Sequence, residues 1–210
     1  MFYILDSDNK YPDVWYNERK VPFSRVDCPV FSGHSRAEKN NDNISIEIKR
    51  KKMGDFVSTV FSDWLITERT AVIFEKQQLT GYKLREVDIS NKVLPFKLWE
   101  IIAVGKAKIH PDSGLKELYR CEHCGLVIHG HSNNNIGIKI DISTWDGCDF
   151  FNIEENQTCV FVSENVKKVV GDHRLTGVLF LPSTELSLGY TFTDADQNWT
   201  KEQWRKHFEK

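Results

Sequence analysis

The chain has 210 residues, of which 40% are hydrophobic, 12% aromatic and 28% charged, and its formal charge at pH 7 is −2. This composition is typical of a folded protein that is long enough to bury a core without disulfide bonds. The nearly balanced charge argues against a general nucleic-acid binder, and the lack of an apolar run of about 18 residues argues against a membrane-spanning helix.

The first strand is expected at the start of the chain. Residues 1–6 are β-prone and lack the basic segment and cleavage site of an export signal. Residues 7–43 are rich in Asp, Asn, Pro and Ser, which predicts loops. Residues 44–48 alternate strictly between apolar and polar side chains, which predicts a half-buried strand. Without an export signal, we expect a cytoplasmic protein whose five cysteines are reduced or bind a metal.

An internal repeat is the most informative feature of the sequence. Residues 64–84 match residues 160–180 without gaps, at a constant offset of 96 residues (160 minus 64). Each copy contains an apolar triplet typical of a short strand, a helix of about ten residues and a Leu-Thr-Gly turn. Thr67 and Ser163 are expected to cap the two helices with their hydroxyl oxygens. Each copy is therefore predicted to be a strand–helix–strand unit.

Further elements are predicted between and after the two copies. Residues 98–104 form an apolar run that predicts a long strand, and the Pro, Asp and Gly in residues 110–114 predict a turn. Thr200 and Gln203 match a capping box, which predicts a helix near residues 200–209.

These elements together predict an α+β fold with mixed or antiparallel sheets, two repeated strand–helix–strand units, a zinc-knuckle-like turn and a C-terminal helix. We expect residues 1–182 to form a single domain that contains the repeat, and residues 183–210 to form a C-terminal extension.

The knuckle-like turn carries the clearest candidate chemistry. Cys121 and Cys124 have the C-x-x-C spacing with which two thiolates bind one Zn²⁺, and Gly125 permits a tight turn after them. Two more ligands are needed, and four interpretations remain open: a local site completed by His129 and His131, a distant site completed by Cys28 and His34, a redox dithiol, and a turn that binds no metal. No set of residues stands out as catalytic.

Several motifs follow one another in a characteristic order: Gly54-Asp55-Phe56, the unit from Trp64 to Gly81, His110-Pro111, Cys121-x-x-Cys124-Gly125, the segment from Ile140 to Phe151, and the unit from Val160 to Pro182. This order resembles the double-CXXCG motif family, which comprises immunity proteins of bacterial contact-dependent and polymorphic toxin systems. The Leu-Thr-Gly units also look like those of a second immunity family from the same loci. The resemblance covers roughly residues 1–182 and implies one immunity-type α+β domain.

The resemblance also implies a structural zinc site. The first knuckle of the family has the pattern C-P-x-C-G, whereas in this chain Phe31 replaces the second cysteine. Three of the four expected ligands are therefore present, namely Cys28, Cys121 and Cys124. His34 is the candidate for the fourth ligand, and the expected cofactor is one structural Zn²⁺.

The function implied by the resemblance is that of an antitoxin without catalytic activity, which binds a cognate toxin domain, such as a nuclease, and covers its active site. Neither a membrane nor a nucleic acid is an expected partner. An acidic stretch without Lys or Arg lies between Lys139 and Lys167 and would complement a basic cleft of the toxin. Its candidate partner-binding residues are Asp141, Trp145, Asp146, Asp149, Phe150, Glu154 and Glu155.

Two alternatives accompany this interpretation. The acidic stretch is also compatible with a solvated loop whose aromatic side chains belong to the core. The whole chain is also compatible with a zinc-knuckle nucleic-acid-binding or regulatory module, which would use the cysteine pair and the basic residues 49–52.

Overall fold

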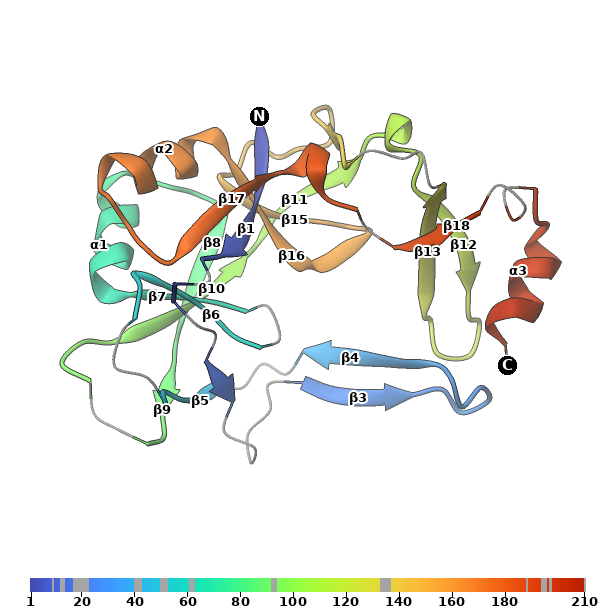
Figure 1. The fold of residues 1–210 in the computed structure, drawn as a ribbon, viewed down its shortest axis with the longest axis horizontal. Helices are drawn as coiled ribbons and strands as arrows, with labels where there is room; N and C mark the ends of the chain where they lie inside the picture. The colour runs from blue at the N-terminus through green and yellow to red at the C-terminus, as the bar shows by residue number, and fades with distance from the viewer. Residues whose placement is uncertain are drawn as a thin grey trace. The chain divides into compact units, whose positions relative to one another are not determined.

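The computed structural model describes residues 1–8, 10–11, 14–16, 23–39, 43–49, 53–60, 63–91, 94–132, 137–187, 189–193, 196 and 198–209. Its helices are α1 (Glu68–Lys76), α2 (Glu164–Asp172) and α3 (Lys201–Phe208), with short 3₁₀ helices η1 (Pro111–Ser113) and η2 (Ser183–Glu185). Its strands are β1 (Phe2–Ser7), β2 (Trp15–Tyr16), β3 (Phe23–Asp27), β4 (Ser35–Lys39), β5 (Ser45–Glu47), β6 (Phe56–Ser58), β7 (Trp64–Thr67), β8 (Tyr82–Glu86), β9 (Asp88–Ile89), β10 (Leu98–Ala103), β11 (Gly105–Ile109), β12 (Lys116–Arg120), β13 (Val127–Ser132), β14 (Ile140–Asp141), β15 (Phe150–Ile153), β16 (Asn156–Ser163), β17 (Val178–Pro182) and β18 (Tyr190–Phe192). This inventory confirms the predicted α+β class (Figure 1).

The chain forms two compact units. Unit 1 comprises residues 1–22, 41–108 and 140–183, and unit 2 comprises residues 23–40, 109–139 and 184–210. The repeat lies entirely in unit 1, whereas the C-terminal segment belongs to unit 2 together with two earlier segments. No helix in the described part of the chain is both long and apolar enough to cross a membrane.

Unit 1 contains both predicted strand–helix–strand units, β7–α1–β8 and β16–α2–β17. One sheet has the strand order β6-β7-β10-β8, and the other has the order β14-β11-β15-β16-β1-β17. In each strand–helix–strand unit, one further strand therefore lies between the two strands that flank the helix. This inserted strand, β10 or β1, comes from elsewhere in the sequence.

The inserted strands are exchanged between the two copies of the repeat. Trp99 of β10 lies opposite Ile66 of β7, and Tyr3 of β1 lies opposite Val162 of β16. Ile66 and Val162 are equivalent at the repeat offset, and Tyr3 and Trp99 differ by the same 96 residues (99 minus 3). The repeat therefore extends to β1 and β10, and each copy completes the sheet of the other.

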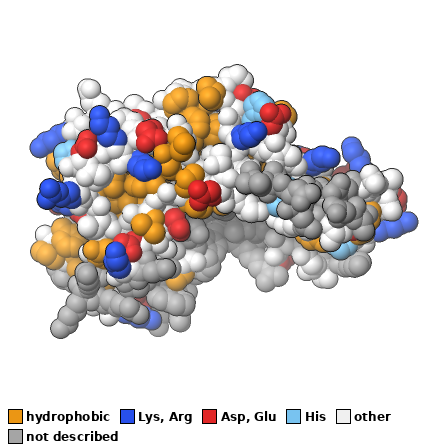
Figure 2. Space-filling view, turned by 45° about the horizontal axis from the view of Figure 1, so that its top comes forward, with side chains coloured by type: hydrophobic (Ala, Val, Ile, Leu, Met, Phe, Trp, Pro, Cys, Tyr) orange, Lys and Arg blue, Asp and Glu red, His pale blue; other side chains and the backbone are white. Residues whose placement is uncertain are grey.

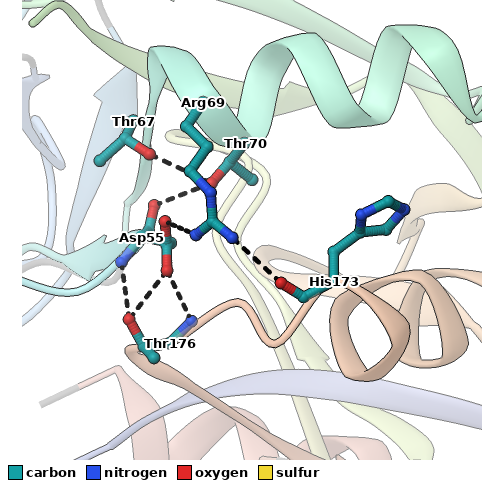
Figure 3. Close-up of polar contacts among 6 residues, drawn as sticks. All are labelled: Asp55, Thr67, Arg69, Thr70, His173 and Thr176. Atoms are coloured by element: carbon teal, nitrogen blue, oxygen red, sulfur yellow. Dashed lines mark hydrogen bonds and ion pairs between the residues drawn. The ribbon is translucent and has the colours of Figure 1, made fainter.

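Two aspartates connect the copies reciprocally. Asp55 Oδ2 accepts hydrogen bonds from the backbone N–H of Thr176 (2.9 Å) and from its hydroxyl (2.9 Å), in the Leu-Thr-Gly turn of the second copy (Figure 3). Asp149 Oδ2 binds Thr80 of the first copy in the same way, at 3.0 and 3.3 Å. Arg69 adds an ion pair to Asp55 at 2.7 Å. Each Leu-Thr-Gly turn is therefore held by an aspartate that lies, in the sequence, shortly before the other copy of the repeat.

The two helices lie side by side (Figure 1). Gln77 Nε2 and His173 Nε2, which occupy equivalent positions 96 residues apart, are 3.3 Å from each other. Phe56, Phe74 and Phe150 are completely buried in the core beneath these helices. The contact between equivalent residues shows that the two copies are arranged around an approximate twofold axis.

The predicted hydroxyl caps of α1 and α2 are wrong. Neither Thr67 nor Ser163 caps its helix with its side chain. Ser163 Oγ donates instead to Asp149 Oδ1 at 2.7 Å, and Thr67 Oγ1 lies 3.2 Å from Thr70 Oγ1. The Ser163 hydroxyl is thus oriented by a charged acceptor, the Asp149 carboxylate, and its oxygen does not accept from the N–H groups at the start of α2.

Unit 2 contains a β3–β4 hairpin, a three-stranded sheet with the order β12-β13-β18, and α3. The capping box of α3 is confirmed, because Thr200 Oγ1 accepts from the N–H of Gln203 (3.3 Å) and Gln203 Oε1 accepts from the N–H of Thr200 (2.8 Å). Trp204 of α3 is buried against Leu118 of β12. The loops predicted for residues 7–43 are wrong in part, since β2, β3 and β4 lie within this range.

Candidate metal centre

The β3–β4 hairpin places the first two candidate ligands. Cys28 and His34 lie at the two ends of its turn, where the N–H of Cys28 donates to the carbonyl of His34 at 2.9 Å. The N–H of His34 donates to the carbonyl of Phe31 (3.0 Å), and the N–H of Phe31 approaches Cys28 Sγ at 3.4 Å. The turn thus directs the backbone toward the Cys28 sulfur although Phe31 stands where a second thiolate was expected.

The second pair of ligands lies in the turn between β12 and β13. The N–H of Cys121 donates to the carbonyl of Leu126 (2.8 Å), and the N–H of Gly125 donates to the carbonyl of Cys121 (3.0 Å). Gly125 has a φ of +71°, which a glycine adopts without steric cost. This tight turn places the thiols of Cys121 and Cys124 on the same side.

The two turns form a cluster that could hold a metal ion. One ligand atom each from Cys28, His34, Cys121 and Cys124 lies within 4.8 Å of the others. The sulfur atoms of Cys28 and Cys121 are 3.9 Å apart, close to the edge of about 3.8 Å of a tetrahedron with Zn–S bonds of about 2.3 Å. The structure therefore assembles the distant completion of the C-x-x-C pair. His131, from the local alternative, lies 2.7 Å from Ser187 Oγ through its Nε2.

His34 carries the clearest sign of a missing partner. Its side chain is 3% exposed, and its Nε2 lies 2.8 Å from the carbonyl oxygen of Phe208 in α3. This contact assigns the proton to Nε2, because a carbonyl can only accept, and leaves a lone pair on Nδ1. Nδ1 is buried without a hydrogen-bond partner among the described residues. A buried unsatisfied nitrogen is costly, and a metal ion would satisfy it.

The local electrostatics favour a thiolate at Cys121. Burial alone raises the pKa of its thiol, but hydrogen bonds, led by those from the N–H groups of Cys124 and His123, outweigh burial and lower this pKa to about 6. The pKa of Cys124 is raised in return: the N–H of Leu126 lowers it, but burial and the neighbouring thiols of Cys121 and Cys28 outweigh that contribution. Of this pair, Cys121 is therefore the thiol that ionises more readily, and its charge disfavours ionisation of Cys124.

The aromatic residues of the acidic stretch pack into unit 1. Phe150 is completely buried, and its ring lies 5.4 Å from that of Phe74. Trp145 is half-buried, with its ring 4.9 Å from that of Phe2, and its indole N–H donates to the carbonyl of Cys148 at 3.0 Å.

Most acidic residues of this stretch hold local structure. Asp146 accepts from the N–H groups of Lys106 (2.8 Å) and Cys148 (3.0 Å), and Asp149 binds Thr80 as described above. The remaining members make more local contacts: Asp141 is half-buried and accepts from Ser143, Glu154 is exposed and pairs with Lys108 at 3.2 Å, and Glu155 is half-buried.

Two contributors to the cluster were not expected from the sequence. The carbonyl of Phe208 orients His34, and the hydroxyl of Tyr119 interacts with Cys121 and donates to Glu209 at 3.0 Å. A backbone carbonyl leaves no trace in the residue types, so only the docking of α3 could reveal it.

Comparison with protein-family models and with curated proteins gives no match.

Proposed function

We propose that this chain is an immunity protein that binds a bacterial toxin domain and neutralises it by covering its active site, without catalysis of its own. The observation that carries the proposal is the structural role of the residues on which the resemblance rests. Asp55 and the two Leu-Thr-Gly turns hold the copies of the repeat together, and Cys28, Cys121 and Cys124 meet in one cluster. Because the motif residues are those that organise the fold, their order supports a shared architecture.

The test is protection of cells from the toxin. The cognate toxin domain should kill cells when it is expressed alone, and co-expression of this chain should restore growth. The two proteins should also elute together as a stoichiometric complex, since inhibition is proposed to work by occlusion. Equal killing with and without this chain, together with separate elution, would exclude the proposal.

We further propose that the cluster binds one structural Zn²⁺ through Cys28 Sγ, His34 Nδ1, Cys121 Sγ and Cys124 Sγ. Three sulfur donors and one nitrogen donor, on three buried residues and one half-buried residue, are a ligand set that structural zinc prefers. All four positions would be filled by the protein, so the ion would join the β3–β4 hairpin to the β12–β13 turn and leave no position for a substrate.

Metal analysis of purified variants tests the zinc proposal. The natural chain should contain one zinc ion, His34→Ala should lose most of it, and His34→Cys should retain it, because a fourth thiolate restores a common zinc ligand set. The site would be contradicted if protein purified from a zinc-containing medium carried no zinc and if a chelator left its stability unchanged.

The acidic stretch can be tested without disturbing the fold. Charge reversal at Asp146 or Asp149 would break contacts between distant segments of unit 1. The informative variants are therefore Asp141→Lys, at a half-buried position that accepts from the neighbouring Ser143, and Glu154→Lys, at an exposed position. If the stretch contacts a basic cleft, each change should weaken toxin binding more strongly at low salt than at high salt. Unchanged affinity would remove these residues from the proposed interface.

The nucleic-acid alternative has less support. Figure 2 shows Lys and Arg side chains on the drawn face singly and beside Asp and Glu, rather than in one basic stripe. Residues 50–52 of the basic run lie outside the described residues. A steep salt dependence of binding to any DNA or RNA would favour this alternative, because phosphate contacts release counterions.

A further inference from the structure

The approximate twofold symmetry of unit 1 allows each surface feature to be compared with its equivalent. In the second copy, Lys167 of α2 extends over the ring of Tyr3 in the exchanged strand β1, with Nζ 4.0 Å from the ring centroid. The hydroxyl of Tyr3 donates to Glu164 of the same helix at 2.8 Å. An ammonium group, an aromatic ring and a carboxylate thus form a compact arrangement on the surface of the protein.

The first copy has the ring and the carboxylate but lacks the lysine. Glu68 is equivalent to Glu164, and Trp99 is equivalent to Tyr3, whereas the position of Lys167 is taken by Ala71. A groove of about 580 Å³ opens at this place between α1 and the strands β8 and β10. Ala71 and Trp99 both line it, so the space occupied by a lysine in one copy is open in the other.

The groove is apolar at its base and acidic at its edge. Tyr82, Leu84 and Trp99 line it together with the carboxylates of Glu68 and Glu75. Neither carboxylate forms an ion pair within the described part of the chain, which leaves the groove with two negative charges. Burial and the nearby Glu75 carboxylate raise the pKa of Tyr82, which agrees with a low-dielectric, negatively charged setting.

A lysine of the described residues lies near this groove and pairs with a carboxylate that does not line it. Lys97 Nζ is 5.6 Å from the ring centroid of Trp99 and 2.8 Å from Glu86. Its proximity shows that the Trp99 ring is accessible to a cation. Lys97 pairs directly with Glu86, and Glu68 adds a weaker electrostatic attraction, so Lys97 offsets the charge of Glu68 only in part and forms no ion pair with Glu75.

We propose that this groove binds a lysine or arginine side chain of the partner protein, in the position that Lys167 occupies in the second copy. The aliphatic stem would pack on Leu84 and Tyr82, and the cation would lie over Trp99 between the two carboxylates. Cation–π contact on a tryptophan is favourable, and burial of the stem adds apolar contact. The proposal rests on the proposed function in that it identifies the partner as the toxin domain.

The variant Ala71→Lys tests the groove, because it places a lysine where the second copy has Lys167. The new lysine should fill the groove as Lys167 fills its equivalent, and affinity for the toxin domain should fall about tenfold or more. Gly171→Lys is the matched control, because it adds the same charge to α2 at an exposed position where a Cβ meets nothing within 4 Å. The control should bind as tightly as the natural chain, whereas equal binding by Ala71→Lys would overturn the proposal.

A second measurement tests cation binding in the groove without the toxin domain. The indole N–H resonance of Trp99, assigned with Trp99→Phe, should shift saturably when acetyl-Gly-Arg-Gly-amide is added, and the matched citrulline peptide should have no effect because it is neutral. The shift should disappear in Ala71→Lys. If the toxin does not bind but these shifts occur, the proposed function fails and the cation site stands; without arginine-specific shifts, the cation site is refuted even if the toxin binds.

Discussion

At the scale of single residues, the two copies of the repeat fill one equivalent cross-strand position with side chains of opposite character. In the four-stranded sheet, Glu100 is completely buried opposite Arg85, whose Nε lies 2.7 Å from Glu100 Oε2. In the six-stranded sheet, the equivalent cross-strand pair is Ile4 and Leu181. A buried ion pair and an apolar pair thus occupy the same place within one molecule.

This equivalence predicts the outcome of exchanging one pair for the other. The double variant Arg85→Leu/Glu100→Ile should match or exceed the stability of the natural chain, because apolar replacement of a buried ion pair is often neutral or favourable. Arg85→Leu alone should cost about 3–5 kcal/mol, since it leaves the Glu100 carboxylate buried and uncompensated. Urea unfolding measures both variants, and a double variant that is as destabilised as Arg85→Leu would contradict the argument.

Cys121 predicts a pH dependence of the metal-free protein. Its pKa of about 6 in the folded state lies below that of an unfolded cysteine, about 8.5. The folded thiolate therefore contributes stability that is fully present above the unfolded pKa and is lost as the pH falls through about 6. Thiolate absorbance at 240 nm should show one group titrating near this pH in the natural chain and none there in Cys121→Ser. A first titration near pH 9 would refute the lowered pKa.

At the scale of elements, the Leu-Thr-Gly turns depend on their glycines. Gly81 and Gly177 have φ values of +81° and +91°. A Cβ at either position would lie 2.2 Å from a carbonyl oxygen, that of Phe150 or of Phe56 respectively. The turns can therefore approach the other copy only because they carry no side chain at this point.

Alanine substitutions test this requirement. Gly81→Ala and Gly177→Ala should each cost about 2 kcal/mol or more, from strained backbone and steric overlap. Gly171→Ala, in α2 with free space around its Cβ, should instead stabilise the chain by about 0.5–1 kcal/mol. Thermal unfolding of the three variants provides the comparison, and similar effects at all three positions would contradict the role of the turns.

The local elements follow directly from sequence patterns, whereas their pairing does not. The repeat predicts both strand–helix–strand units, and the capping box predicts α3, because these signals lie within a few neighbouring residues. The exchange of β1 and β10 could not be predicted, since residues 2–7 and 98–103 share little beyond β-propensity. Strand partners far apart in the sequence are selected by the whole core rather than by local propensity.

The candidate metal centre was also predicted only in part from the sequence. All four side chains of the cluster were candidates from the sequence, but the choice between Cys28 with His34 and His129 with His131 needed the β3–β4 hairpin. That hairpin lies in a polar segment without clear alternation, which explains why loops were expected there. Its geometry depends on backbone hydrogen bonds within the turn that carry no signature in residue type.

At the scale of the whole molecule, the division into two units predicts a selective effect of metal removal. A chelator should accelerate amide hydrogen exchange in unit 2, at β3, β4, β12, β13 and α3, because the proposed zinc joins the turns of that unit. Exchange in α1 and α2 of unit 1 should stay the same. Equal acceleration in both units would show that the chain responds as one cooperative body, and no acceleration anywhere would count against the zinc.

The exchanged strands constrain the order of events during synthesis. Strand β1, with Tyr3, Ile4 and Leu5 buried in the finished sheet, leaves the ribosome before either of its neighbours, β16 and β17, has been translated. An apolar strand with two unpaired edges must therefore wait for more than half of the polypeptide. Until then β1 is exposed to pairing with strands of other nascent chains. The delay before β16 and β17 are translated therefore sets the period during which the chain is prone to aggregate.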